Sequence, residues 1–179
     1  MTRFVAFLRG INVGGRSVKK DLLKGIFEGL GFEQVVTYKQ SGNVIFETEE
    51  TDPNVARKRI ETALRQELGY DVAVLIRTFA DLRIVAKVEP KVRDKDVLTF
   101  LVTLLPTPVH EFPLPLPLKI PKSTAQVLSR SEAEVFSVTY GGGDSALPNP
   151  FLESKLGVKT TTRNMNVIRE LVERFGQSQ

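Results

Sequence analysis

The 179-residue chain contains no cysteine and a single histidine, His110. The lack of cysteine excludes disulfide scaffolds, cysteine-ligated zinc, iron–sulfur clusters and thiol nucleophiles. One histidine excludes histidine-cluster metal sites and disfavours a Ser-His-Asp triad. We therefore expect no metal site. The sequence names neither a cofactor nor a reaction, and it leaves open whether the chain is an enzyme, because no general base or carboxylate pair stands out.

Long hydrophobic runs are also missing. No apolar run approaches the roughly 18 residues that cross a membrane, and the apolar segment 4–8 is too short for a secretion signal and predicts a first strand instead. We expect a cytoplasmic protein with no membrane partner. The composition, 41% hydrophobic and 26% charged, is that of a globular protein, and the length suits one domain or two small subdomains.

Three helices are expected in the first half of the chain. Asp52 followed by Pro53 is typical of an N-cap and a first helical residue. Thr78 with Asp81 three residues later resembles a capping box. Together with the apolar periodicity, these signals predict helices that begin at residues 17, 53 and 79 and end before Gly31, at Gly69 and before Pro90.

Four β-rich runs lie between these helices. A glycine-containing hairpin signal, residues 40–43, joins the second run to the third. The order is then β-α-β-β-α-β, which predicts an α+β fold with a ferredoxin-like N-terminal part followed by a smaller α/β C-terminal part. We place the first subdomain at residues 1–78 and a C-terminal α+β subdomain, packed on it, at residues 79–179. The four runs are residues 4–8, 35–38, 44–47 and 72–76.

The second half is less regular. Six of the ten prolines fall within residues 106–121, which excludes helix or central strand there and predicts an extended connector. Three threonines, residues 160–162, precede the last apolar period and predict its N-cap. The expected elements are a buried strand at 97–105, a hairpin at 125–130 and 135–140, a short helix at 151–156 and a last helix at 163–175.

The net charge of +4 is unevenly distributed. Residues 1–24 hold six cations and one acid, and residues 154–169 hold four cations and no acid. Such segregation indicates a local attraction for anions, although Lys and Arg on two surface helices would look the same.

A glycine-rich segment, residues 9–17, joins the first strand to the first helix. Backbone N–H groups of such a turn can approach an anion, and the helix N-terminus adds a favourable dipole. The segment is neither a Walker A motif nor a dinucleotide-binding fingerprint. The alternative is that its glycines only permit a tight connection.

The predicted topology brings this segment to the same sheet edge as the hairpin at 40–43, because the first and third strands are neighbours. Two polar loops meeting at one edge can form a binding site. Turn formation alone would also explain the hairpin residues. The candidate ligand-binding residues at this edge are Arg9, Asn12, Gly14, Gly15, Arg16, Tyr38, Gln40, Ser41 and Asn43.

Arg163 and Asn164 are further candidates, at the start of the last predicted helix. A cation in a first helical turn opposes the helix dipole. We therefore expect Arg163 to pair with a carboxylate or an external anion.

Three motifs together resemble a known family. Residues 8–15 (LRGINVGG), 37–46 (TYKQSGNVIF) and 161–166 (TTRNMN) are similar to the hallmarks of an uncharacterised bacterial family, domain-of-unknown-function family 1697. The resemblance implies an α+β protein with a ferredoxin-like part and no established activity, so no catalytic residue is carried over. The chain departs from the family pattern at Met165, at Val167 and in residues 143–146, which puts a ligand-binding role of the C-terminal half in doubt.

The expected function is binding of an anionic small molecule, a nucleotide or a phosphorylated metabolite, at the glycine-rich loop. Two other classes stay open. One is nucleic-acid binding through the basic segments, which we do not favour because no RNP-like motif is present. The other is a homo-oligomeric interaction module, such as a homodimer formed through an exposed sheet edge.

Overall fold

The computed structural model describes residues 1–12, 14–15, 17–39, 42–92, 97–140 and 147–177. The chain forms two compact units, Met1–Leu82 and Arg83–Gln179. The boundary predicted after residue 78 lies four residues before this division. The second unit is the longer of the two, where the sequence suggested a smaller part.

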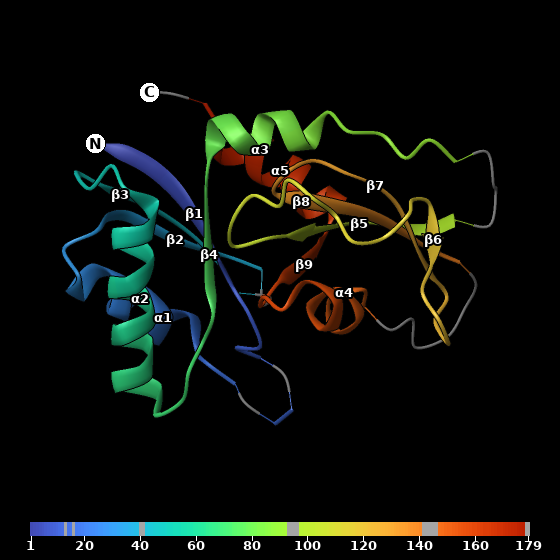
Figure 1. The fold of residues 1–179 in the computed structure, drawn as a ribbon. Coiled ribbons are helices and arrows are strands. Elements are labelled where there is room, and N and C mark those ends of the chain that lie inside the picture. Colours follow the sequence, from blue (N-terminus) through green and yellow to red (C-terminus); the bar gives the residue numbers. More distant parts are fainter. Residues whose placement is uncertain (13, 16, 40–41, 93–96, 141–146, 178–179) are drawn as a thin grey trace. The chain divides into compact units, whose positions relative to one another are not determined.

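The first unit is a four-stranded sheet with two helices on one face (Figure 1). Its strand order is β2-β3-β1-β4, and every neighbouring pair is antiparallel. This is the ferredoxin-like βαββαβ arrangement, as predicted. Its elements are β1 (Thr2–Leu8), α1 (Lys20–Gly29), β2 (Glu33–Tyr38), β3 (Asn43–Thr48), α2 (Pro53–Leu68) and β4 (Val74–Thr78).

Local signals set the bounds of α2. The Asp52 carboxylate accepts a hydrogen bond from the Asn54 N–H at 2.8 Å, and Pro53 occupies the first helical position. At the other end Gly69 adopts a φ of +77° and its N–H donates to the Arg65 carbonyl. The helix predicted from these residues is confirmed.

The core of the first unit is rich in phenylalanine. Phe46 of β3 is fully buried, and its ring lies 4.6 Å from that of Phe32, 5.5 Å from that of Phe27 and 5.8 Å from that of Phe4 (centroid distances). Ring pairs at these separations contribute beyond the apolar area that they bury. The cluster therefore joins both central strands to α1.

The second unit contains a five-stranded antiparallel sheet of order β6-β7-β8-β5-β9. The hairpin predicted at 125–140 is confirmed, and only two residues of the proline-rich connector pair as a strand. The elements from residue 79 onward are α3 (Phe79–Ala86), β5 (Val97–Leu104), β6 (Leu118–Lys119), β7 (Ala125–Arg130), β8 (Glu134–Tyr140), α4 (Asn149–Leu156), β9 (Thr161–Asn164) and α5 (Met165–Phe175).

The capping box predicted for α3 is present. The Thr78 N–H donates to the Asp81 carboxylate and the Asp81 N–H donates to the Thr78 hydroxyl, each at 3.1 Å. The far end of α3 is bound by Arg169 of α5, which donates to the carbonyls of Ala86 and Val88. The bond to Ala86 satisfies a carbonyl group that a helix end leaves without an intrahelical partner, and the bond to Val88 holds the segment that follows the helix.

The last helix starts later than the sequence predicts. Residues 161–164 form β9, which pairs with β5 from Leu104↔Thr161 to Leu101↔Asn164. The predicted threonine N-cap is therefore wrong. Asn164 is the cap of α5, and its side-chain oxygen accepts a hydrogen bond from the Asn166 N–H at 2.9 Å. Threonine suits strands because its branched side chain packs well on a pleated surface. Pairing with β5, about sixty residues away in the chain, decides between a helix cap and a strand.

The β8 residue Ser137 gives a prediction about stability. Ser137 is fully buried, and among the described residues its hydroxyl has no hydrogen-bond partner. Since an unsatisfied buried hydroxyl keeps its desolvation penalty, Ser137→Ala is expected to raise the free energy of unfolding by about 1 kcal/mol. Thr103→Val is the control, because the equally buried Thr103 hydroxyl lies 2.8 Å from the Thr162 hydroxyl, and its removal is expected to lower stability. Urea denaturation measures both, and a loss of stability in Ser137→Ala would contradict the assignment.

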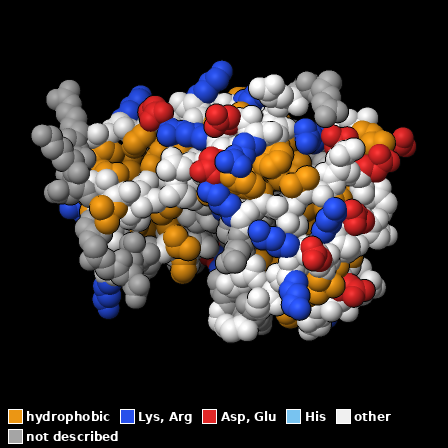
Figure 2. Space-filling model, turned by 180° about the vertical axis from the view of Figure 1, so that it is seen from behind, with side chains coloured by type: hydrophobic (Ala, Val, Ile, Leu, Met, Phe, Trp, Pro, Cys, Tyr) orange, Lys and Arg blue, Asp and Glu red, His pale blue; other side chains and the backbone are white. Residues whose placement is uncertain are grey.

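The surface carries mixed charge. On the face shown in Figure 2, cationic and anionic side chains are interspersed with hydrophobic ones. In the part of the chain that the structure describes, no helix combines the length and apolar character needed to cross a membrane.

Candidate functional site

The segment after β1 is fixed by hydrogen bonds at both of its ends. The Arg9 N–H donates to the Ala73 carbonyl at 2.9 Å, just before β4 begins. Further along, the Asn12 side-chain oxygen accepts a hydrogen bond from the Val18 N–H at 2.8 Å. Between them Ile11 is buried. The segment is thus a closed loop anchored by an apolar side chain, with Asn12 holding its base.

The glycines of this loop take left-handed backbone conformations. Gly10, Gly14 and Gly15 have φ values of +69°, +62° and +81°, which other residues adopt only with strain. Gly14 and Gly15 are exposed, whereas Gly10 is half-buried. The exposed pair presents backbone to solvent. The predicted site residue Arg16 lies outside the described residues.

The turn between β2 and β3 is held by Asn43. This side chain is fully buried, and its amide donates to the Tyr38 carbonyl at 2.9 Å. Lys39 has a φ of +56°, and its ammonium lies 5.6 Å from the centre of the Tyr38 ring. The predicted site residues Gln40 and Ser41 lie outside the described residues. Asn43 therefore holds the turn together from inside.

The loop and the turn are in direct contact. The Leu8 N–H donates to the Gly42 carbonyl at 2.8 Å. Gly42 has a φ of +75°, and a Cβ on it would lie 2.8 Å from Cγ2 of Ile11 and 3.0 Å from Cβ of Leu8. Only a residue without a side chain fits there. The first two sequence motifs are therefore joined through Leu8, Ile11 and Gly42.

Two cations belong to this junction. Burial lowers the pKa of Arg9 below its usual range, because the charged guanidinium loses contact with water. Arg9 is half-buried and Lys39 is exposed. A partly desolvated cation interacts more strongly with an anion than a fully hydrated one.

The N-terminus of α1 does not lie where the sequence places it. The helix begins at Lys20 instead of residue 17, so positions 16–19 of the sequence separate Gly15 from its first turn, which also carries Asp21. Asn12 closes the loop on Val18 before the helix starts. The helix dipole therefore does not strengthen anion binding by the N–H groups of Gly14 and Gly15, although the sequence predicts this, because its effect is confined to the first helical turn.

The third motif lies in the second unit, and its arginine is buried. Arg163 is 7% exposed, and its Nη1 donates to the Thr161 hydroxyl at 2.7 Å and to the Thr162 carbonyl at 2.9 Å. Burial lowers its pKa to about 10. Because Arg163 sits in β9, the prediction of a cation in a first helical turn is wrong. The other candidate in this motif, Asn164, is the cap of α5.

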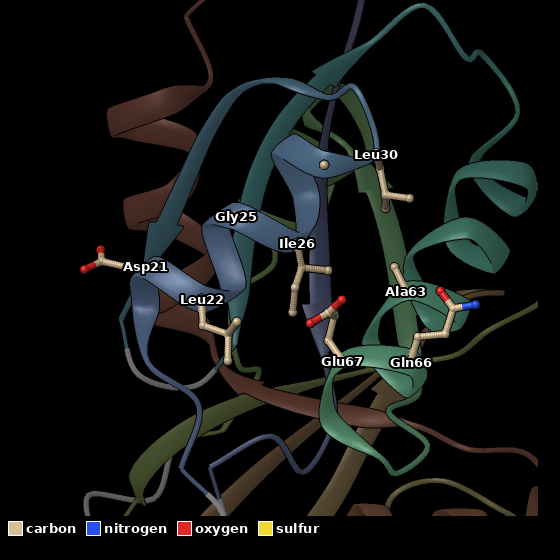
Figure 3. Close-up of a pocket in the computed structure, with 9 residues that line it drawn as sticks. Asp21, Leu22, Gly25, Ile26, Leu30, Ala63, Gln66 and Glu67 are labelled. Atoms are coloured by element: carbon tan, nitrogen blue, oxygen red, sulfur yellow. The ribbon is translucent and has the colours of Figure 1, made fainter.

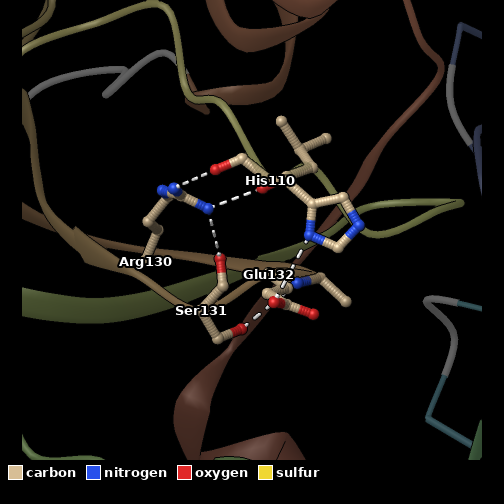
Figure 4. Close-up of polar contacts among 6 residues, drawn as sticks. His110, Arg130, Ser131 and Glu132 are labelled. Atoms are coloured by element: carbon tan, nitrogen blue, oxygen red, sulfur yellow. Dashed lines mark hydrogen bonds and ion pairs between the residues drawn. The ribbon is translucent and has the colours of Figure 1, made fainter.

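His110 takes part in a surface contact (Figure 4). Its Nδ1 lies 3.4 Å from the Glu132 carboxylate, and both side chains are exposed. Arg130 donates to the carbonyls of Val109 and His110 and holds this part of the connector on the β7–β8 turn. His110 thus belongs to a structural contact.

The acidic run at residues 47–52 also has structural roles. Glu50 accepts a hydrogen bond from the Asp52 N–H, and Asp52 caps α2. Across the described ranges, no group of three or more His, Cys, Asp and Glu side chains could hold a metal ion.

Sequence reasoning missed three contributors to the junction. Ala73 supplies the carbonyl that fixes Arg9, and only the β1–β4 pairing brings it there. Lys39 and Gly42 lie within the second sequence motif, where the sequence predicts Gly42 as a turn residue and assigns Lys39 no role. The signal for Gly42 was its place in the predicted hairpin turn, but its contact with Ile11 depends on the tertiary structure.

Fold and site together define an α+β protein with a ferredoxin-like unit, an antiparallel five-stranded unit and a loop–hairpin junction at one edge of the first sheet. The chain belongs to the DUF1697 family of proteins of unknown function, whose model matches residues 1–136. It is also similar in structure to the conserved bacterial protein SP0830 from Streptococcus pneumoniae, with a TM-score of 0.71 at 20% sequence identity over 97% of this chain and 99% of that one. No curated protein sequence matches the chain. The family assignment confirms the predicted resemblance, and the structural likeness supports the fold.

Proposed function

We propose that the first unit binds an anionic small molecule, a nucleotide or a phosphorylated metabolite, at the junction of the β1–α1 loop and the β2–β3 turn. The observation that carries the proposal is the Leu8 N–H to Gly42 carbonyl bond, which joins the glycine loop to the hairpin motif. Binding sites commonly lie where loops converge on a rigid scaffold. We place this activity in the cytoplasm, where such phosphorylated molecules are abundant.

The charge and backbone of the loop support an anionic ligand. The half-buried Arg9 supplies a guanidinium, whose planar fork suits phosphate oxygens. The exposed backbone at Gly14 and Gly15 is the part of the loop whose N–H groups a phosphate could approach. Arg16, Gln40 and Ser41 complete the proposed set of ligand contacts.

The two asparagines have a different role from the one that the sequence suggested. Asn12 and Asn43 each make a hydrogen bond within the first unit, to Val18 and to Tyr38. We assign them to shaping the loop and the turn. Arg163 and Asn164 belong to the second unit and are not part of this proposal.

Arg9→Ala is the variant that tests the site. Loss of one charge-assisted contact is expected to cost about 1.5–3 kcal/mol of binding, which is roughly a ten- to hundred-fold rise in Kd. Isothermal titration with ATP, and separately with inorganic phosphate, measures it. The matched control is Arg65→Ala, an exposed arginine of α2 in the same unit, which is expected to leave Kd unchanged. Equal affinity in wild type and Arg9→Ala would overturn the proposal.

A nucleic-acid function would give a different result in the same experiment. Binding of a short oligonucleotide would then fall steeply with salt, because it releases many counterions, and small phosphates would not compete. That outcome would overturn the small-molecule proposal and identify the basic segments as a nucleic-acid-binding site.

A further inference from the structure

Lys39, the residue that follows β2, has a backbone conformation that suits glycine better than lysine. In the described part of the first unit, six glycines have a positive φ, and Gln34 and Lys39 are the two other residues that do. Gln34 lies where the β2–β3 register is irregular. Lys39, with a φ of +56°, lies in the turn, where a side chain costs backbone strain that glycine avoids. Residues that break a local preference in this way concentrate at functional sites.

The side chain of Lys39 is placed by its neighbour Tyr38. The Lys39 ammonium lies 5.6 Å from the centre of the Tyr38 ring. Tyr38 is half-buried, and its carbonyl accepts a hydrogen bond from the buried Asn43 amide at 2.9 Å. A cation over an aromatic face keeps its charge. Because Lys39 is exposed, this charge is presented to solvent at a defined place on the turn.

Lys39 and Arg9 leave the first sheet at the same edge. β1 and β2 both run antiparallel to β3, which lies between them, so β1 and β2 end at one edge. Phe7, Asn43 and Tyr38 form one row across the three strands. Lys39 follows this row by one residue and Arg9 by two. Since β1 and β2 are two strand spacings apart, about 10 Å, the two cations leave the sheet side by side and not at one point.

We infer that Lys39 is a second ligand-contacting cation, and that the junction takes a compound with two or more linked phosphoryl groups. One phosphoryl group lies against Arg9 and the exposed backbone of Gly14 and Gly15, and the next one reaches the Lys39 ammonium. A single phosphate engages only one of the two cations fully, whereas a linked pair gives each cation an anionic partner. The inference rests on the proposed anion site and narrows its ligand to polyphosphates.

Other hollows of the first unit do not suit such a ligand. One of about 480 Å³ lies between α1 and α2 and is lined by Asp21 and Glu67, with no Lys or Arg among its described lining residues. Figure 3 shows the Glu67 carboxylate directed toward α1. A second hollow, at the end of β3, is lined by three glutamates and one arginine. Because like charges repel, these carboxylates disfavour a polyphosphate in both places.

Pyrophosphate and inorganic phosphate are the probes that test this inference, because they differ by one linked phosphoryl group. Isothermal titration of the full chain is expected to give a Kd for pyrophosphate about ten-fold or more below that for phosphate. Lys39→Gln removes one charge-assisted contact and is expected to lower this ratio about ten-fold while leaving the Kd for phosphate unchanged. Lys39→Arg keeps the charge and is expected to keep the ratio, which a merely structural role of the side chain would not require.

Two further variants complete the experiment. Lys58→Gln is the matched control, because Lys58 is an exposed lysine of α2 in the same unit, and it is expected to leave the ratio unchanged. Lys39→Gly cannot strain the turn, because glycine takes a left-handed φ freely, and it is expected to lose the preference for pyrophosphate as Lys39→Gln does.

The outcomes separate this inference from the proposed function. A ratio that Lys39→Gln leaves intact, or that Lys58→Gln lowers equally, overturns the role of Lys39, while phosphate binding that depends on Arg9 still supports the anion site. A wild type that binds neither probe overturns both.

Discussion

Replacing Phe46 by alanine is expected to lower the free energy of unfolding of the first unit by about 3–5 kcal/mol. The side chain is fully buried and contacts three other phenylalanine rings, so its removal takes away buried apolar area and leaves a cavity. The rings come from β1, α1 and the segment before β2, which cannot all move inward at once. Little of the cavity can then be filled by relaxation, which places the loss at the upper part of this range.

Hydrogen exchange measures this loss within the first unit. Amides of β1 and β3 in Phe46→Ala are expected to exchange faster by about two to four orders of magnitude, since each 1.4 kcal/mol is a factor of ten. Val55→Ala is the control, because Val55 is a half-exposed residue of α2 and its truncation is expected to change stability by less than about 0.5 kcal/mol. Protection in Phe46→Ala that matches the control would show that the aromatic cluster does not hold the sheet together.

Most of the first unit could be predicted because its signals are local. The N-cap at Asp52, the capping box at Thr78 and the stop at Gly69 are each formed by residues within four positions of one another. Alternating strands and helices then leave few ways to pair the sheet, and the ferredoxin-like order follows. A fold can be predicted from its sequence where local signals agree with the overall topology in this way.

The end of the chain could not be predicted in the same way. Residues 161–164 form a strand only because β5 provides the partner, and nothing near residue 163 in the sequence indicates that pairing. The burial of Arg163 follows from the same pairing. The sequence predicts that Arg163 binds an anion at a helix terminus. In the structure its guanidinium instead donates hydrogen bonds to Thr161 and Thr162 within the sheet.

The candidate site could be predicted only in part. The topology was sufficient to bring the glycine loop and the hairpin to one edge of the sheet. How closely the loop and the hairpin approach each other could not be predicted, because that distance depends on how Ile11 packs against Gly42. The start of α1 was also missed: the helix begins at Lys20, and the Val18 N–H before it bonds to the Asn12 side chain six residues back, a loop contact that the apolar periodicity does not indicate.

The close contact at Gly42 predicts a large loss of stability when this glycine is replaced by alanine. Gly42→Ala places a methyl group 2.8 Å from Cγ2 of Ile11 and keeps a φ of +75°, which is unfavourable for alanine. The left-handed backbone costs about 1–2 kcal/mol, and the overpacking adds about 1–3 kcal/mol. We expect the free energy of unfolding, measured by urea denaturation, to fall by about 2–5 kcal/mol.

Gly31→Ala separates the two contributions. Gly31 follows α1 with a φ of +78°, but a Cβ on it would meet no described atom within 4 Å. Its substitution carries the backbone cost alone, about 1–2 kcal/mol. The extra loss in Gly42→Ala therefore measures the close approach of the hairpin to the loop. It is also expected to weaken ATP binding, because Ile11 and the loop around it must shift to admit the methyl group, whereas Gly31→Ala is expected to leave binding unchanged. Equal destabilisation by the two variants would mean that the loop and the turn yield easily to each other, and a rigid junction could then not be what positions Arg9.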